Sequence, residues 1–93
     1  MRVRTLEVDF RIPGSRSLKE KRGRLARLTR HLTKKHPVVV AEVGDQNIWA
    51  RTGLAAVTIS PDPNLAFKVL EAAARTVAED RDLELVWFEI ERR

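Results

Sequence analysis

The order in which strand and helix patterns follow one another constrains the fold of this chain more than any other feature. Apolar and polar side chains alternate over residues 4–12, which predicts a strand with one buried face. Pro13-Gly14 ends this strand. Three further segments have strand character, namely residues 38–43, 53–60 and 83–91.

The first helix is predicted directly after the Pro-Gly turn. Ser17 and Glu20 form a capping box, in which the serine oxygen accepts a free backbone N–H and the glutamate reaches back to the cap. The helix should run to about Lys35, because Pro37 cannot continue it. Four leucines at helical spacing form its buried stripe: Leu18, Leu25, Leu28 and Leu32.

A second helix is predicted between the third and fourth strands. Asp62 is its cap and Pro63 its first residue, where a missing N–H costs nothing, and residues 80–82 end it. The resulting order βαββαβ is typical of a ferredoxin-like α+β sandwich, in which a four-stranded antiparallel sheet carries two helices on one face. Since no linker divides the chain, residues 1–93 are expected to form a single domain.

The composition excludes several kinds of site and a membrane-spanning helix. The chain has no cysteine, which excludes disulfides, a thiolate nucleophile and a cysteine-ligated metal. No stretch approaches the roughly 20 apolar residues of a membrane helix, and no apolar signal region follows the basic N-terminal residues. We therefore expect a soluble cytoplasmic protein without a membrane partner.

Charge is concentrated in one segment of the chain. Residues 16–35 hold nine basic side chains and one acid, Glu20, which is a local charge of +8. The whole chain carries +5, so the remaining residues together carry −3. This distribution indicates a directed electrostatic surface, although a basic helix can also be no more than a solvated face.

The first hypothesis is that the basic helix binds RNA phosphates. Arginine and lysine contacts to phosphates supply affinity and position without reading the base sequence. The protein would then be a non-catalytic RNA- or ribosome-associated protein that binds through residues 16–35. The predicted nucleic-acid-binding residues are Arg16, Lys19, Arg22, Arg24, Arg27, Arg30 and Lys34.

The alternative hypothesis is a homo-oligomeric regulatory protein that binds a small molecule or an anion. Its site would combine the turn at residues 14–22, next to the positive end of a helix, with the loop that contains Trp49. An ordinary capped helix start and a tryptophan that plugs the core edge would explain the same features. The candidate anion and loop residues are Ser15, Ser17, Lys21, Gln46, Trp49 and Arg51.

Lys21 stands out because it occupies the centre of the leucine stripe, where a core residue belongs. The commoner outcome for such a lysine is that its stem packs on apolar neighbours and its ammonium reaches water. The other outcome is that the ammonium meets a carboxylate or the Trp49 loop.

No arrangement of side chains indicates catalysis. His31 and His36 are five positions apart and do not share a helix face as paired metal ligands would. Glu7 and Asp9 share one face of the first strand, but an open sheet face is not a desolvated cleft for acid–base work. We expect no enzyme activity, no cofactor and no metal site.

The sheet face away from the helices is expected to join subunits. An apolar centre with a charged border favours a homodimer, formed through the open sheet face or a sheet edge. By strand register the apolar centre is predicted to hold Val38, Val40, Leu54, Ala56, Leu85 and Trp87. Its charged border is predicted to hold Glu7, Asp9 and Glu89.

Several motifs together resemble the YlxP-like family of small bacterial proteins. They are the run from Ile12 to Arg22 (IPGSRSLKEKR), the run from Val40 to Val43 (VAEV), and Gln46, Trp49 and Arg51. The resemblance implies a ferredoxin-like fold and an unassigned function. Because family members are often encoded beside translation initiation factor 2 and ribosome-binding factor A, it also implies work at the ribosome. The positions that carry over, without a catalytic role, are Ser17, Leu18, Lys19, Lys21, Arg22, Gln46 and Trp49.

Overall fold

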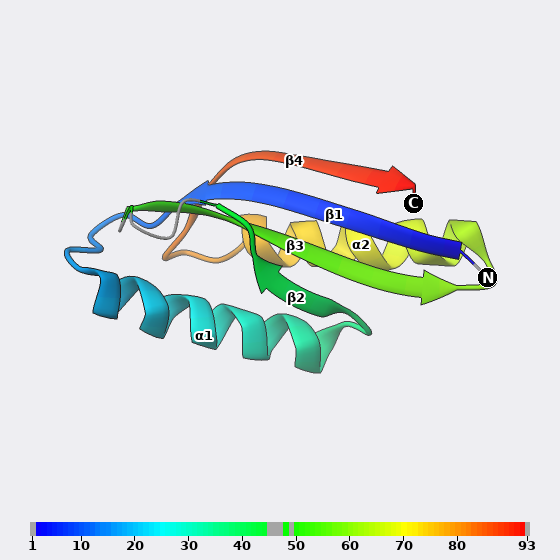
Figure 1. The fold of residues 1–93 in the computed structure, drawn as a ribbon, viewed down its shortest axis with the longest axis horizontal. Helices are drawn as coiled ribbons and strands as arrows, with labels where there is room; N and C mark the ends of the chain where they lie inside the picture. The colour runs from blue at the N-terminus through cyan, green and yellow to red at the C-terminus, as the bar shows by residue number, and fades with distance from the viewer. Residues whose placement is uncertain (1, 45–47, 49, 93) are drawn as a thin grey trace.

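A computed structural model describes residues 2–44, 48 and 50–92 of the chain. Its elements follow the predicted order βαββαβ (Figure 1). They are β1 (Arg2–Arg11), α1 (Leu18–Lys35), β2 (Val39–Glu42), β3 (Arg51–Ser60), α2 (Pro63–Ala78) and β4 (Glu84–Arg92). The predicted ferredoxin-like arrangement is therefore confirmed.

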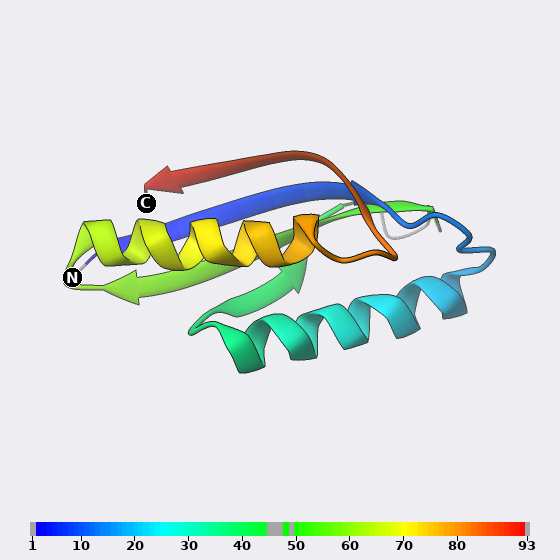
Figure 2. The same ribbon diagram turned by 180° about the vertical axis from the view of Figure 1, so that it is seen from behind.

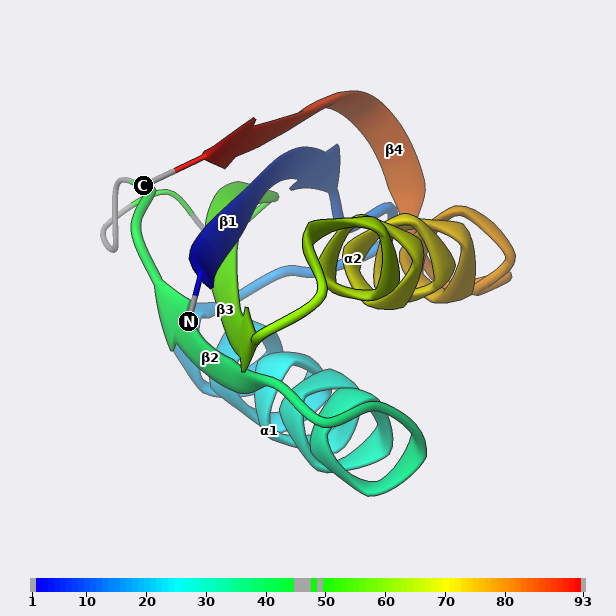
Figure 3. The ribbon, with the colours of Figure 1, turned by 90° about the vertical axis from the view of Figure 1, so that its right-hand side faces the viewer.

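The four strands form one antiparallel sheet in the order β2-β3-β1-β4. Both helices lie on the same face of this sheet and leave the other face open (Figures 2 and 3). The core fills the space between the sheet and the helices, and its largest apolar side chains with less than 2% exposure are Phe10, Leu6, Ile12, Leu70 and Val77. No helix in the described part of the chain combines the length and the hydropathy that a membrane crossing requires.

Both helix starts are capped as the sequence predicts. Ser17 Oγ accepts the backbone N–H of Glu20 at 3.1 Å. The Glu20 carboxylate accepts the N–H of Arg16 at 2.8 Å, one residue before the cap. At the start of α2, Asp62 Oδ1 accepts the backbone N–H of Asn64 at 2.9 Å. These bonds satisfy donors that the first helical turn leaves without intrahelical partners.

β3 begins two residues earlier than predicted, at Arg51. The predicted strand 53–60 leaves Arg51 and Thr52 in the preceding loop, but both pair with β1, opposite Arg11 and Phe10. The loop prediction is wrong here because pairing with a long neighbouring strand extends β3 beyond its own apolar run.

The predicted facing of β2 and β3 is wrong. Val38, Leu54 and Ala56 are predicted on the open face but are buried in the core, and Val40, predicted there too, packs against the core. The reason is strand pairing: Leu54 lies directly opposite Val8, and opposite residues in an antiparallel pair share a face. Changing the facing by one residue exchanges every side chain between the two faces.

β4 contains an irregularity that the sequence did not reveal. The register of β1 with β4 shifts between Asp9 and Phe10, so that Asp9 pairs with Trp87 and Phe10 pairs with Leu85. Leu85 therefore packs against the core instead of lying on the open face. Trp87 does lie on the open face, as predicted, and is 47% exposed.

Candidate nucleic-acid interface

The buried stripe of α1 determines where its basic residues point. Leu25, Leu28 and Leu32 are buried, as predicted, and Leu18 is half-buried. Each helical residue turns by about 100°, so this stripe directs the opposite side of the helix to solvent. That outer side carries four basic residues, called here the basic face: Lys19, Arg27, Arg30 and Lys34.

All four residues of the basic face are exposed. Arg16, Arg22 and Lys35 are also exposed and surround it. Within residues 2–44, 48 and 50–92, none of these seven side chains forms an ion pair. The single acid of the segment, Glu20, already accepts the backbone N–H of Arg16. The positive charge of these seven side chains is therefore presented to solvent without a neutralising partner among the described residues.

Gly23 lies in the middle of the basic face. A Cβ at this position would meet no atom within 4 Å. The surface between Lys19 and Arg27 is therefore open down to the helix backbone. An extended polyanion can approach the helix axis more closely here than at any position with a side chain.

Arg24 lies at the edge of the basic face. Its side chain is half-buried, and Nη1 donates to the carbonyl oxygen of Pro13 at 2.8 Å. This bond fastens the connection between β1 and α1 onto the helix. Arg24 is thus held at the edge of the basic face by a contact within the protein.

Acidic residues limit the basic face on the side of α2. Arg24, Arg27 and His31 line a hollow of about 170 Å³ together with Asp80 and Asp82 from the turn after α2. Carboxylates at this border lower the local positive potential and repel phosphates. The positive potential of the basic face is therefore highest on the part turned away from α2.

Lys21 is completely buried, with 1% of its surface exposed. Its Nζ lies 3.1 Å from Glu42 Oε2 and donates to the carbonyl oxygen of Ile48 at 2.6 Å. Thr52 donates its hydroxyl proton to the same Glu42 oxygen. The favoured expectation that the ammonium reaches water is wrong, and the other outcome, a carboxylate together with the loop before Trp49, is confirmed.

Several residues of the candidate anion site already have partners within the protein and are not available to an anion. Lys21 is engaged by Glu42, and the Ser17 hydroxyl is the helix cap. Ser15 is buried, and its Oγ donates to the carbonyl oxygen of Ser17 at 3.5 Å. Gln46 and Trp49 lie outside the described residues. Among its described members, the candidate anion site therefore has no cation available to an anion at the helix start. The available cations there are those of the basic face and of the exposed residues around it.

Arg51 lies on the opposite side of the sheet from Lys21. Its Nη2 and Nε bind the two oxygens of Asp9 at 2.6 and 3.1 Å. These hydrogen bonds, followed by the charge of Arg51 and that of Arg11, lower the pKa of Asp9 below its ordinary value, against the opposing effect of burial. The same pair raises the pKa of Arg51. The sequence-predicted residues Lys21 and Arg51 are therefore not brought together.

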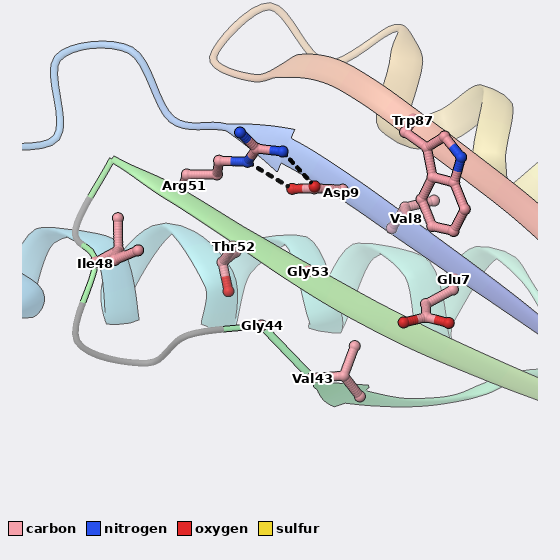
Figure 4. A pocket seen from close by; sticks show the side chains of 10 residues that line it. All are labelled: Glu7, Val8, Asp9, Val43, Gly44, Ile48, Arg51, Thr52, Gly53 and Trp87. Atoms are coloured by element: carbon pink, nitrogen blue, oxygen red, sulfur yellow. Dashed lines mark hydrogen bonds and ion pairs between the residues drawn. The ribbon is translucent and has the colours of Figure 1, made fainter.

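A hollow of about 240 Å³ lies beside this ion pair on the open face (Figure 4). Glu7, Asp9 and Trp87 line it from β1 and β4, and Val43 borders it near the end of β2. Gly53 contributes no side chain, which leaves the hollow open between β3 and β1. With two carboxylates and one arginine, its lining does not favour an anion.

His36 joins the end of α1 to α2. Its ring Nε2 is 2.8 Å from the hydroxyl oxygen of Thr76, which in turn donates to the carbonyl of Ala72. Burial, reinforced by the charges of Lys35 and His31, lowers the pKa of His36. In the described part of the chain, no group of three or more histidine, aspartate or glutamate side chains could hold a metal ion.

The contacts of Lys21 with Glu42, and of Glu42 with Thr52, were not predicted from the sequence. A signal for Glu42 exists, since a lysine in a leucine stripe that does not reach water requires a nearby acid. Glu42 is the only acid of the run from Val40 to Val43. Nothing in the sequence around Thr52 indicates its contact with Glu42.

Comparison with known proteins agrees with an unassigned function. The family model described as "Protein of unknown function (DUF503)" matches residues 3–90, which is nearly the whole chain. Among the curated proteins, none matches the chain.

Proposed function

We propose that this chain, which belongs to the DUF503 family of proteins of unknown function, is a non-catalytic RNA-binding protein that contacts phosphates through α1. One observation carries the proposal. Lys19, Arg27, Arg30 and Lys34 project to solvent from one side of α1, without ion pairs among the described residues. We further propose the ribosome as the source of the RNA, because the family resemblance of the sequence implies work there.

Counterion release explains why such a surface favours a polyanion. Each phosphate that a lysine or arginine neutralises releases condensed cations, and the affinity therefore falls as salt rises. Seven exposed basic side chains of residues 16–35 form no ion pair among the described residues, and the rest of the chain carries a net −3, so α1 is the surface best able to release several cations together.

The dimensions of α1 suit contact with several phosphates. Lys19 and Lys34 are 15 residues apart, which corresponds to about 22 Å along a helix with a rise of about 1.5 Å per residue. Arg27 and Arg30 lie between them. Because such contacts position the protein without reading bases, we expect recognition of RNA shape and backbone rather than of sequence.

The experiment is a titration of labelled ribosomal RNA fragments at several salt concentrations. With about four phosphates contacted, the logarithm of affinity should fall against the logarithm of salt with a slope near −3, at about 0.7–0.9 per contact. The combined variant Arg27→Gln, Arg30→Gln and Lys34→Gln should bind more weakly and with a flatter slope. It should remain folded, because all three side chains are exposed.

A matched variant keeps the test specific to α1. Lys68→Gln, Arg75→Gln and Arg81→Gln together remove the same charge from exposed positions on and after α2. This control should retain most of the parent's affinity and its slope. If both triple variants weaken binding equally, only net charge matters, and the proposed interface is wrong. Cosedimentation with ribosomal subunits at low salt, and release at high salt, tests the ribosomal source separately.

A further inference from the structure

The open face of the sheet consists of two halves of different polarity. The half formed by β2 and β3, called here the apolar half, presents Val39, Ala41, Val43, Ala55, Val57 and Ile59. The half formed by β1 and β4, called here the acidic half, presents Glu7, Glu89 and Glu91. The pairing Val39–Val57, Ala41–Ala55, Ala55–Glu7 and Glu7–Glu89 places these residues on one face.

The apolar half leaves large side chains in water. Val39 is 74% exposed, Ile59 58% and Val43 49%. None of the six positions of this half carries a charge or a polar side chain. These positions form one continuous apolar surface, which a partner can cover.

The acidic half contains a repulsive pair. Glu7 and Glu89 lie directly opposite each other on β1 and β4, and both are exposed. Like charges directly opposite in a sheet are destabilising. Asp9 is neutralised by Arg51, but neither Glu7 nor Glu89 forms an ion pair with the residues that the structure describes. A cationic surface from another molecule would remove this repulsion.

α1 supplies such a surface on the opposite margin of the same molecule. Figures 1 and 3 both show α1 beyond β2, on the side away from β4. Thr33 of α1 lines a hollow together with Val39, so this flank of the helix borders the apolar half. By helical spacing, Arg22 lies on the same flank as Thr33. The order across the molecule is therefore acidic, apolar and basic.

We propose that a second copy of this chain docks face to face on the open sheet, related by a two-fold axis parallel to the strands above β2 and β3. This axis places the apolar half of one protomer on the apolar half of the other. It also places the acidic half of each protomer against the α1 flank of its partner. A two-fold axis perpendicular to the strands would place the two acidic halves on each other, which charge repulsion disfavours.

The size of the apolar half shows why the charged margins are needed. β3 has ten residues and β2 has four, so with strands spaced by about 4.8 Å and a rise of about 3.3 Å per residue they cover roughly 220 Å². A stable interface buries about 800 Å² per partner. The apolar half alone is too small, and the interface must extend over the acidic half and the α1 flank.

The positions of the charges along the strand direction, called here their height, agree with this axis. Lys21 contacts Glu42. The preceding residue of β2, Ala41, belongs to a row of residues that pair across the sheet, from Ala41 through Ala55 and Glu7 to Glu89. Arg22 follows Lys21 and is therefore near this row. Since an axis parallel to the strands preserves height, Arg22 of one protomer faces Glu89 of the partner subunit.

The test measures the dimer dissociation constant of the full chain by sedimentation equilibrium at micromolar concentrations. Val39→Asp should give a monomer, because it places a charge in the apolar centre. Glu89→Arg and Arg22→Glu should each weaken the dimer about tenfold or more, since like charges then meet. The two changes combined should restore the parent's dissociation constant. Arg30→Glu, on the basic face, is the matched control and should leave it unchanged.

Three results would overturn the proposal. The parent chain could be a monomer throughout the concentration range. The Val39→Asp variant could remain a dimer, which would place the contact at a sheet edge. The combined charge exchange could bind as weakly as its single variants, which would exclude the proposed axis. Circular dichroism of each variant establishes that the chain is folded, and none of these results depends on RNA binding.

Discussion

Lys21 Nζ lies 3.1 Å from Glu42 Oε2 although Lys21 stands in the middle of the leucine stripe of α1. The contact joins α1 to β2, and Thr52 extends it to β3. The Ile48 carbonyl accepts a further proton of the ammonium. A buried charge is tolerated here because the Glu42 carboxylate and the Ile48 carbonyl both accept from it, and Thr52 in turn donates to Glu42.

Removing this ammonium should destabilise the protein strongly. We expect Lys21→Met to lower the free energy of unfolding by about 3 kcal/mol, because it leaves the Glu42 carboxylate without its counter-charge and the Ile48 carbonyl without the donor that Lys21 supplies. Lys19→Met, at an exposed position of the same helix, should change it by less than about 0.5 kcal/mol. Urea denaturation measures both values. Equal effects would show that the ammonium of Lys21 is not held by its neighbours.

A double-mutant cycle should show that Lys21 and Glu42 act together. The combined variant Lys21→Met and Glu42→Leu should be more stable than the sum of the single effects predicts, by about 1–3 kcal/mol. The physical reason is that replacing both partners removes the uncompensated charge that each single change leaves. Strict additivity in urea denaturation would contradict a direct interaction.

The pKa of His36 predicts a loss of stability in weak acid. Burial, with the charges of Lys35 and His31, lowers this pKa in the folded protein below its ordinary value of 6.5. The unfolded chain therefore binds the proton more readily than the folded one. The contribution of His36 to stability should be complete above pH 6.5 and should decrease as the pH falls towards the folded pKa.

Two measurements check this prediction. NMR titration of the His36 ring should give a midpoint below 6.5 in the folded protein. The stability of His36→Gln should depend less on pH than that of the parent in this range, because glutamine does not titrate. Parallel pH profiles of the two proteins would show that His36 does not contribute to the slope.

The pair of Asp9 and Arg51 predicts a separate effect at lower pH. Two hydrogen bonds from Arg51 lower the pKa of Asp9 below 3.8. The stability that this carboxylate contributes is present above pH 3.8 and should be lost as the pH falls through the lowered folded pKa. Arg51→Gln should raise the pKa of Asp9, as measured by carboxyl carbon NMR.

Arg11→Gln provides the comparison for Asp9. Arg11 acts on Asp9 through charge alone, as the last of the three lowering effects. Its replacement should therefore raise the pKa of Asp9 less than Arg51→Gln does. The reverse order would mean that the hydrogen bonds to Arg51 are not the main cause.

Gly23 offers a stabilising substitution. A Cβ at this exposed helical position meets nothing within 4 Å, so Gly23→Ala should raise the free energy of unfolding by about 0.5–1 kcal/mol. Gly53→Ala should do the opposite, because its Cβ would lie 3.2 Å from the carbonyl oxygen of Val8. Thermal denaturation compares the two. A destabilised Gly23→Ala variant would be inconsistent with the open surface around this residue.

The sequence by itself determined the elements and their order. The strand pattern of residues 4–12, the capping box of Ser17 and Glu20, and the leucine stripe after it are local signals, since each depends on residues that are neighbours along the chain. Together they specify a βαββαβ order that has few alternatives for a chain of this length. The exposure of the basic face follows from the same stripe, because a helix that buries one side presents the other to solvent.

Only the tertiary structure decided the facing of β3 and the partner of Lys21. Both sides of β3 are mainly apolar, with Leu54 and Ala56 on one and Ala55 and Val57 on the other, so periodicity does not distinguish them. Pairing of Leu54 with Val8 makes the choice, because β1 has one clearly apolar face. Glu42 likewise reaches Lys21 across 21 positions of sequence, a distance that only the packing of α1 against β2 closes. Contacts between segments far apart in the chain depend on how whole helices and strands pack together. Local sequence patterns do not predict this packing.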